Sequence, residues 1–573
     1  MGVYAGVTDD YLTQSDQTGV ADAVEKYRLW SLSKEGDPGR TPALDLNFAE
    51  NKSLVDDISG NNLITFTRSS AATYVGADGL IKTAGLNLFT NSGLPFSDGR
   101  SPNGSVDDIN VYEGTADQFS TILISGNQNH SYISVTSGTS YTLSFYAKSG
   151  TGSSAVVEFV TNVGASASNQ ATIGLSQSGG RVSAILTATL TGSIQVRFGS
   201  QGSGLTYSLG GIQVEVGDTA TVYADTASST SGAPRFDHDP DTGESLGLLI
   251  EESSTNEWSN SESMIQSTYV TVGYTLPGGL TNPAGGSTAV KILSGSTRTW
   301  WNRGTGGFAV TSGDYWTMSW WAYSTNQSVD FGNSDYFNVA NTTISQDKTV
   351  SAGQWKRCYR TVEFTASGSP QIRFMPYNYT LYTDTNNEVF VWGFQFEKKA
   401  FPTSYIPTSG STATRTPDLT SITGSNLTSW YNVSEGTLYV DYKGEVPGGA
   451  TGGYFGTNVN GWGVYSNDVR ITNKGRTDFS PDRGAYNISN KQVSLYRGAI
   501  SQSDIVGKTS YAVNGTLYAT DADRLGPYTT PLGFSVSAAD VGAASQTRGS
   551  FTVKRTMYWG LKLSNSTLQS ITE

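Results

Sequence analysis

The stretch Tyr141-Thr-Leu-Ser-Phe-Tyr-Ala147 recurs further along the chain as Trp316-Thr-Met-Ser-Trp-Trp-Ala322. Both copies alternate apolar and polar residues, and residues two apart lie on the same face of a strand. The pattern therefore predicts a β-strand with one buried face. It sends one ring of each adjacent aromatic pair (Phe145-Tyr146 and Trp320-Trp321) inward and the other outward.

Three further blocks repeat in the same order around these strands. The matches are Asn87–Ser92 with Asn256–Ser261, Gln195–Phe198 with Gln371–Phe374, and Gly211–Glu215 with Gly393–Glu397. Ordered agreement at several places indicates an internal repeat. We therefore expect two homologous modules, residues 86–232 (module 1) and 253–407 (module 2). Each is long enough to form a jelly-roll β-sandwich that buries a core without disulfides.

Composition supports an all-β protein and excludes several function classes. The 573 residues include 66 Gly, 11% aromatic and only 15% charged residues, which is typical of many short strands. The net charge of −13 argues against nucleic-acid binding. One cysteine, Cys358, excludes an intrachain disulfide, and two histidines disfavour zinc or His-based catalysis. No apolar run is long enough for a membrane span, so no membrane insertion is expected. The start Met1-Gly-Val-Tyr4 lacks the features of a signal peptide, so we expect synthesis and assembly in a cytoplasm.

Residues 1–43 differ from the rest because they predict a short helical segment. Val20, Val24, Tyr27 and Trp30 are spaced to share one helical face. A single helix cannot bury such a face alone. It either packs on the following domain or docks onto another chain, including copies of itself.

Acidic residues gather around residues 237–252. Asp237, Asp239, Asp241 and Glu244 alternate in a way that suits a calcium ion, although the glycine is displaced from calcium-loop spacing. The alternative is a turn between strands at 234–239 and 246–250, set by Asp-Pro and Thr-Gly. Glu251-Glu252 would point to opposite faces of a strand, and we interpret the pair as part of a solvated linker. No cofactor is expected beyond a structural calcium ion held by loop carboxylates.

Aromatic residues accumulate in module 2. Sugars stack their C–H faces on exposed aromatic rings, while amides and charged groups hold their hydroxyls. The candidate glycan-binding residues are Trp300, Trp301, Asn302, Arg303, Tyr377 and Tyr379. The alternative is that these rings pack in the core or against a neighbouring subunit.

The modules resemble carbohydrate-binding jelly rolls of the kind appended to glycan-degrading enzymes and phage tail proteins. The blocks Tyr141–Ser149, Trp316–Ser324, Gly211–Val216 and Trp392–Glu397 carry this resemblance. It implies a sandwich fold, and implies sugar binding only weakly.

The flanking segments resemble sequences that recur in structural proteins of tailed bacteriophages. These segments are Ile64–Ile81, Pro234–Glu252 and Phe401–Gly410. In such proteins the first two often run together, so module 1 resembles an insertion between Gly85 and Pro234, and residues 233–252 would be a β-hairpin linker. The resemblance implies a virion protein such as a tail fibre, head fibre or decoration.

Residues 408–573 resemble a concanavalin-like or laminin-G-like lectin sandwich. The strand Glu435–Tyr442 and the ending Thr556–Thr572 carry this resemblance. Such domains often open with a strand like Leu44–Phe48, within the strand-rich segment 44–85. The lectin-like sandwich is therefore expected to be discontinuous, with both modules looped out of it. Contacts between Leu46 and the strand at 551–561 would identify this arrangement.

These observations lead us to expect serial jelly-roll sandwiches in a non-enzymatic phage virion protein that binds host-surface glycan or neighbouring virion proteins. The alternatives are a capsid decoration protein that only bridges its neighbours, and a tail-associated glycan depolymerase. The expected partners are the portal, adaptor, capsid or tail proteins, and the helix with Val20, Val24, Tyr27 and Trp30 would dock onto them. A homotrimer is expected by analogy with phage fibres alone.

Overall fold

The computed structural model is built almost entirely of β-strands, which confirms the all-β fold class. Its described part contains three short helices: α2 (Phe48–Asn51), α3 (Ser425–Thr428) and α4 (Asn565–Thr572). The helix expected in residues 1–43 falls almost wholly outside the described residues. The structure describes residues 41–90, 106–107, 121–125, 127–200, 206–218, 220–221, 223, 226, 231–262, 274–275, 279–292, 301–303, 309–331, 335–374, 387–432, 435–445, 454–457, 463–465, 494–503, 508–513, 516–523, 533–535, 549–561 and 563–572.

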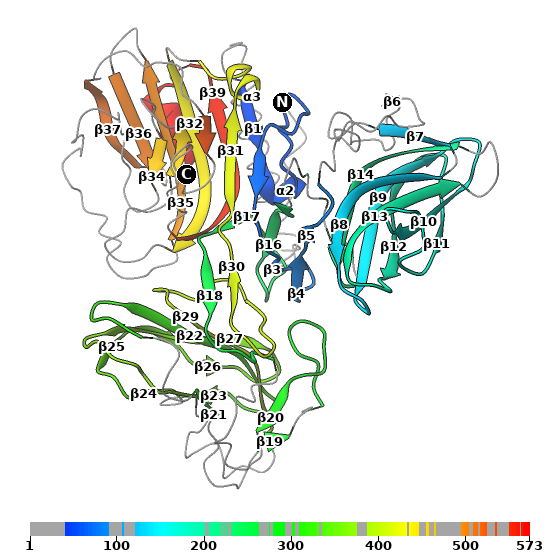
Figure 1. The fold of residues 1–573 in the computed structure, drawn as a ribbon. Helices are drawn as coiled ribbons and strands as arrows, with labels where there is room; N and C mark the ends of the chain where they lie inside the picture. The colour runs from blue at the N-terminus through cyan, green and yellow to red at the C-terminus, as the bar shows by residue number, and fades with distance from the viewer. Residues whose placement is uncertain are drawn as a thin grey trace, which may run out of the picture.

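Three lobes make up the molecule, and the lobe that contains both the early and the late segments is here called the base (Figure 1). The larger base sheet has the order β16-β17-β39-β32-β35-β36-β37, with β1 on β39, and the smaller has the order β2-β31-β38-β33-β34. The larger sheet comprises β1 (Leu44–Leu46), β16 (Arg235–His238), β17 (Ser245–Glu251), β32 (Glu435–Glu445), β35 (Ser494–Ser503), β36 (Lys508–Val513), β37 (Thr516–Asp523) and β39 (Ser550–Trp559). The smaller comprises β2 (Thr65–Thr67), β31 (Leu419–Thr423), β33 (Tyr454–Thr457), β34 (Gly463–Tyr465) and β38 (Gly533–Ser535).

The base is assembled from parts of the chain that lie far apart in sequence. Strand β1 pairs antiparallel with β39, so that Leu46 lies opposite Thr556. Leu44 and Leu46 are fully buried in a core shared with β32 and β39. The hairpin β16–β17 belongs to the same sheet, because β17 also pairs with β39. Residues 233–252 thus form the β-hairpin expected from sequence, and this hairpin is also part of the larger base sheet.

Modules 1 and 2 are separate β-sandwiches that project from the base, module 1 with two sheets and module 2 with one large and two small sheets (Figure 1). Module 1 has the sheets β12-β9-β14-β7-β6 and β11-β10-β13-β8, and module 2 has the sheets β25-β27-β22-β29-β20-β19, β21-β28-β24 and β23-β26. The strands of module 1 are β6 (Val106–Asp107), β7 (Thr121–Ser125), β8 (Gln128–Val135), β9 (Ser140–Ser149), β10 (Ser154–Val160), β11 (Ala171–Gly174), β12 (Gly180–Thr187), β13 (Gly192–Ser200) and β14 (Thr206–Val216). Those of module 2 are β19 (Tyr274–Thr275), β20 (Val290–Ile292), β21 (Trp301–Arg303), β22 (Tyr315–Ser324), β23 (Val329–Asp330), β24 (Asp335–Phe337), β25 (Asn341–Asp347), β26 (Thr349–Val350), β27 (Lys356–Phe364), β28 (Ile372–Phe374) and β29 (Val389–Glu397).

The two modules have matching topologies, so the sequence repeat is also a structural one. The order β27-β22-β29-β20-β19 in module 2 corresponds to β12-β9-β14-β7-β6 in module 1. Phe145 and Trp320 hold equivalent places on β9 and β22, and both are fully buried. Their neighbours Tyr146 and Trp321 lie on the opposite face, each beneath an arginine guanidinium.

Each module joins the base through a short two-stranded stem. In module 1 the stem is β5 (Leu86–Asn87) paired with β15 (Ser231–Gly232). In module 2 it is β18 (Ser254–Asn256) paired with β30 (Ala413–Arg415). Both chain ends of a module are thus adjacent, as an insertion into a base loop requires. The hairpin β3 (Ala72–Val75) and β4 (Ile81–Ala84) packs beside β16.

Candidate functional site

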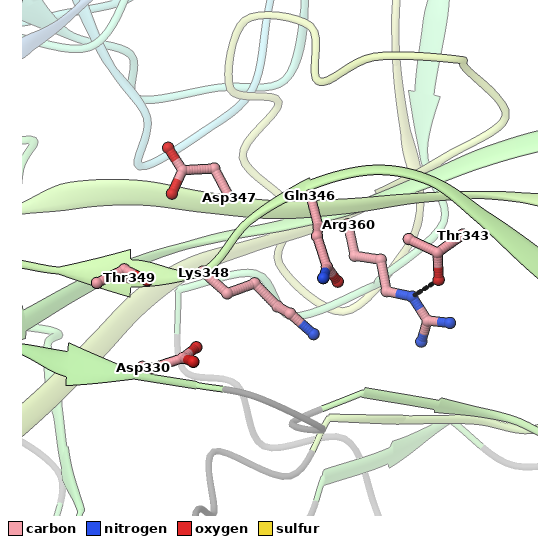
Figure 2. A pocket seen from close by; sticks show the side chains of 7 residues that line it. All are labelled: Asp330, Thr343, Gln346, Asp347, Lys348, Thr349 and Arg360. Carbon is pink, nitrogen blue, oxygen red and sulfur yellow. Dashed lines mark hydrogen bonds between the residues drawn. The ribbon is translucent and has the colours of Figure 1, made fainter.

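A polar groove lies in module 2 between the edge of the six-stranded sheet and the small sheet β23-β26 (Figure 2). Its cavity volume is about 420 Å³. The lining residues come from β23, β25, β26, β27 and the turn between β25 and β26. They are Asp330, Thr343, Gln346, Asp347, Lys348, Thr349 and Arg360.

The strand pattern of β27 places Arg360 in this groove. Cys358 and Val362 lie two residues to either side of Arg360 on the same face, and both are fully buried in the core. Arg360 is therefore directed toward the interior of the sandwich. Gln346 is its partner on the edge strand β25, so the two side chains share that face. The groove therefore opens at the edge strand β25, on the face of the sheet that further inward packs against the core.

Thr343, Asn341 and Phe337 are among the groups that hold the guanidinium of Arg360. Nε donates a hydrogen bond to Oγ1 of Thr343 at 2.9 Å, and Nη2 donates to Oδ1 of Asn341 at 3.3 Å. The guanidinium carbon also lies 5.6 Å from the ring centroid of Phe337, within cation–π range. These contacts fix the plane of the guanidinium in the groove wall.

The acidic and basic residues of the groove lie in different directions. Asp347 points away from the groove centre, whereas Lys348 reaches toward it (Figure 2). The carboxylate of Asp347 pairs with the ammonium of Lys356 at 2.8 Å. The same ammonium donates to the carbonyl oxygen of Thr349 at 2.9 Å. Asp330 lines the groove on the side of β23.

Module 1 does not have an arginine at the position of Arg360. Cα pairing makes Ala184 of β12 the counterpart of Arg360, since Ala184 lies opposite Leu143 as Arg360 lies opposite Met318. Ala184 and its neighbour Val182 pack against the apolar core. The polar groove is thus a property of module 2 and not of the shared fold.

The glycan-binding residues predicted from sequence lie mostly outside the described part of the chain. Trp300, Tyr377 and Tyr379 fall there entirely, and Trp301, Asn302 and Arg303 are described only as strand β21. The pairing of β21 with β28 brings the Trp301 strand beside the segment that precedes Tyr377. The prediction for these side chains stays open. The docking residues Val20, Val24, Tyr27 and Trp30 also lie outside the described residues.

The acidic hairpin forms a turn and does not gather its carboxylates. Oδ1 of Asp239 accepts hydrogen bonds from the backbone N–H groups of Asp241 and Thr242. Gly243 has a φ of 71°, a left-handed conformation that favours glycine.

The two outer acids of the hairpin are directed elsewhere. Asp237 accepts from the backbone N–H of Val75 at 2.7 Å, and Glu244 pairs with Lys554 at 2.7 Å. Among the described residues no group of three or more His, Cys, Asp or Glu side chains stands close enough to hold a metal ion. The hairpin thus contains the turn given as the alternative, and the calcium prediction for Asp237, Asp239, Asp241 and Glu244 stays a prediction.

A buried charge cluster joins the base to both stems, and sequence reasoning missed it. Its members, here called the joint, are Arg68, Arg235, Glu251, Arg415 and Asp418. The side chains of Arg68, Arg235 and Asp418 are fully buried, and those of Glu251 and Arg415 are 1% exposed. Oδ1 of Asp418 lies 2.9 Å from Nη1 of Arg68, and the same carboxylate also pairs with Arg235. Arg235 in turn pairs with Glu251 at 2.7 Å.

Glu251 is the acid most enclosed by this cluster. Its carboxylate accepts from the backbone N–H and the hydroxyl of Ser404, at 2.8 and 2.6 Å. Burial alone would raise the pKa of Glu251, but the charges of Arg415 and Arg235 outweigh it and hold that pKa well below its usual range. Glu251 is thus a buried ion and not part of a solvated linker. Its partners lie 16 or more residues away in sequence, so no local pattern could have revealed them.

Comparisons with known proteins give distant structural likenesses only. No protein-family model and no curated protein sequence matches the chain. An arabinose-bound α-L-arabinofuranosidase, MgGH51, is 14% identical with a TM-score of 0.19, over 27% of this chain and only 31% of that one. The tandem CBM22-1–CBM22-2 domain of Xyn10C from Paenibacillus barcinonensis is 13% identical with a TM-score of 0.18, over 55% of this chain and 98% of that one.

The baseplate tripod of bacteriophage Tuc2009 is similar over 42% of this chain and 92% of that one, at 14% identity and a TM-score of 0.17. TM-scores this low assign the chain to none of these proteins. Among the described residues, none of the helices has the length and apolar character needed to cross a bilayer.

Proposed function

We propose that this chain is a structural protein of a bacteriophage particle and that module 2 binds glycan in its polar groove. The observation that carries the binding role is the row formed by Arg360 and Gln346 in the core-facing plane of the sheet. Arg360 is half-buried and Gln346 is exposed, so both side chains reach the edge of the sandwich, where a ligand can contact them. Module 1 builds the same sheet with Ala184 at the position of Arg360. A polar residue in module 2 at a position where the same fold in module 1 has an apolar residue is expected at a functional site.

The chemistry of the lining suits sugar hydroxyls. Hydroxyl, amide, carboxylate and cationic groups alternate around the groove, and each can donate to or accept from a hydroxyl. The groove holds no nucleophile–base pair that we would assign, so binding without bond cleavage is the proposed activity. The tail-associated depolymerase is the alternative, and an assay of reducing ends after incubation with host polysaccharide tests it.

The particle role rests on the phage-like segments in the sequence. We propose that the chain assembles with portal, adaptor, capsid or tail proteins and that the first 43 residues provide the anchor. A capsid decoration protein without receptor binding is the second candidate. Immunogold labelling of purified particles would place the protein, and label absent from every particle would refute the role. If protein lacking residues 1–43 still incorporates, the anchor lies elsewhere.

Glycan binding is tested with a matched pair of variants. Gln346→Ala removes a lining amide of module 2, and Gln177→Ala removes an exposed glutamine from the β11–β12 turn of module 1. We expect Gln346→Ala to weaken binding to host surface polysaccharide about 10-fold and Gln177→Ala to leave it unchanged. Equal affinities for both variants would remove the groove from the function.

A further inference from the structure

Strand β12 forms an open edge of its sheet in module 1. It pairs with β9 on one side, and the described residues place no strand on its other side. In module 2 the counterpart of β12 is β27, and the same side of β27 is covered by β25. Ser183 of β12 corresponds to Tyr359 of β27, whose partner on β25 is Asp347. The fold therefore accepts an antiparallel strand at this edge.

The backbone groups of alternate residues face outward along the edge. The side chain of Asn169 accepts from the N–H of Thr187 at 2.6 Å and donates to the carbonyl oxygen of Ile185 at 3.2 Å, which identifies the outward set as the odd-numbered residues. Asn169 covers the edge at that end only. The N–H and C=O groups of Arg181 and Ser183, together with the N–H of Ile185, are left without a partner in the described part of the chain.

Apart from Asn169, the edge carries none of the features that usually keep edge strands from pairing. Such strands are short, interrupted by a bulge, or lined with charge or proline. The pairing of β12 with β9 runs over eight residues without a shift, whereas the described edge strands β8, β25 and β37 each contain a register shift. Arg181 is the only charged residue between Glu158 and Arg197.

The side chain of Arg181 does not protect the edge. Its guanidinium is turned back over its own sheet, where Nη2 donates to Oγ of Ser144 at 2.8 Å. The guanidinium carbon lies 5.9 Å from the ring centroid of Tyr146, which is also on β9. The side chains that remain at the edge on this face are those of Ser183 and Ile185, which are exposed, Ile185 by 46%.

We propose that two copies of this chain pair through β12, so that their module 1 sheets join into one continuous antiparallel sheet across a two-fold axis at Ser183. In this register Ser183 lies opposite Ser183 of the partner subunit, and Ile185 lies opposite Arg181 of the partner subunit. The N–H of Ser183 then donates to the carbonyl oxygen of its copy, and the N–H of Ile185 donates to that of Arg181, in both directions. Strand addition of this kind is a common mode of recognition.

The arrangement of the edge favours a second copy as the occupant. A two-fold contact uses the same surface on both chains, so that surface must be self-complementary. The unpaired backbone groups lie on both sides of Ser183, at Arg181 and at Ile185, as such a contact requires. The chain carries a net charge of −13, but this contact brings together stretches whose single charge, Arg181, faces an apolar residue and not itself.

The contact does not depend on the proposed glycan site. A three-fold assembly cannot close through a two-fold contact. In a trimer of the kind expected from phage fibres, β12 would therefore join one trimer to the next.

Disulfide trapping tests the register. Cα atoms of a hydrogen-bonded antiparallel pair lie about 5.5 Å apart, which a disulfide can span. We expect mild oxidation to convert most of the full-length Ser183→Cys variant into a covalent dimer on non-reducing gels. Val163→Cys, at an 83% exposed turn residue of the same module, should stay uncrosslinked. The native Cys358 is fully buried, so it should not react in either variant.

Sedimentation velocity on the full chain measures the association itself. Ile185→Lys places a cation opposite Arg181 of the partner subunit in both halves of the contact, whereas Ile185→Glu places an anion there. We expect Ile185→Lys to associate about 10-fold more weakly than Ile185→Glu, as two cross-strand charge pairs predict. Val163→Lys adds the same charge away from the edge and should leave the association unchanged.

A proline at the centre of the contact gives an independent variant. Ser183→Pro removes an outward N–H, which an edge strand tolerates, and it should abolish the association. The melting temperature of each variant is measured alongside. If Ser183→Pro does not fold, the comparison of Ile185→Lys with Ile185→Glu still decides.

Three outcomes would overturn the proposal. In the first, Ser183→Cys is trapped no faster than Val163→Cys. In the second, the chain associates but Ile185→Lys and Ile185→Glu do so equally, which places the contact on another surface. In the third, the chain stays monomeric and instead binds a synthetic peptide with the sequence of β25, residues 341–347, which shows that the edge takes a strand of a different chain.

Discussion

Replacing Glu251 by Gln should strongly destabilise the base, because it leaves buried arginines without one of their carboxylate partners. The change removes one negative charge from a cluster of three arginines and two acids. Gln also presents an N–H₂ group to Arg235, whose Nη1 lies 2.7 Å from Oε2 in the native protein. Removing one partner of a buried ion pair costs about 3–5 kcal/mol. That is a large share of a typical domain stability of about 5–15 kcal/mol.

The matched control is the next residue, Glu252→Gln. Glu252 forms a single ion pair with Lys399 at 2.9 Å, and its side chain is 13% exposed. Burial raises the pKa of Glu252 in spite of Lys399, so we expect this variant to change the free energy of unfolding by no more than about 1 kcal/mol. Both variants are unfolded in guanidinium chloride, and scanning calorimetry separates the transition of the base from those of the modules. If the two losses agree within about 0.5 kcal/mol, which is the spread of surface substitutions, the joint does not stabilise the base as argued.

The pH dependence gives a second check on the same group. The pKa of Glu251 is held below its usual range in the folded chain, so its ionised form contributes stability above the unfolded-state pKa of about 4.3. That contribution is lost as the pH falls through the range below about 4. The stability gap between wild type and Glu251→Gln should therefore be constant above about pH 5 and shrink below it. A gap that is independent of pH would refute the ionic origin.

Three further changes test the architecture. Leu46→Ala should lower the free energy of unfolding of the base by about 2–5 kcal/mol and leave the modules unchanged, as calorimetry would show, whereas Ile58→Ala at a 46% exposed side chain should do neither. Replacing residues 86–232 by a two-residue Asn-Gly turn should leave base and module 2 folded by circular dichroism and calorimetry, because the ends of the excised segment already lie side-by-side in an antiparallel pair. Asp237→Asn should stabilise the base at pH 8 by about 1–2 kcal/mol and not at pH 4 in chemical denaturation. Burial raises the pKa of Asp237 to about 6, so its ionisation opposes folding as the pH rises through that value.

The strands, their buried faces and the turns could be predicted from local patterns in the sequence. The alternation around Phe145 and Trp320 correctly predicted one buried and one outward ring on each strand. The turn residues of the acidic hairpin, including Gly243, indicated the connection between β16 and β17. These features depend on neighbours within a few residues, and a single sequence displays such neighbours directly.

The joint and the groove could not be found in this way, because their partners are set by tertiary structure. Glu251 lies 167 residues from Asp418, whose carboxylate accepts its backbone N–H. A pair of glutamates after a strand has the same local pattern whether it is solvated or enclosed by arginines. Arg360 was hidden for a different reason. Its inward direction becomes clear from the burial of Cys358 and Val362 on the same face, and the alignment of β27 with β12 then shows that module 1 has Ala184 at this position.

A comparison of the two modules distinguishes polar residues that both copies need for attachment from polar residues that only one copy has. Asn87 accepts from the backbone N–H of Val214 at 3.1 Å, and Asn256 accepts from that of Phe396 at 3.1 Å, so each stem is tied to its sheet in the same way.

The segment that follows the last strand of each module is also tied to that strand by a matching hydrogen bond. Glu215 accepts from the backbone N–H of Thr221 at 3.0 Å, and Glu397 accepts from that of Thr403 at 2.9 Å. Buried polar groups that recur in both copies serve attachment, because both copies must be attached. Arg360 is half-buried and is present in one copy alone, so it is not needed for attachment, and this is why we assign it to ligand binding. Grafting Arg360 and its neighbours onto β12 would test the reasoning directly: binding gained by module 1 would support it, and a folded graft without binding would place the recognition elsewhere in module 2.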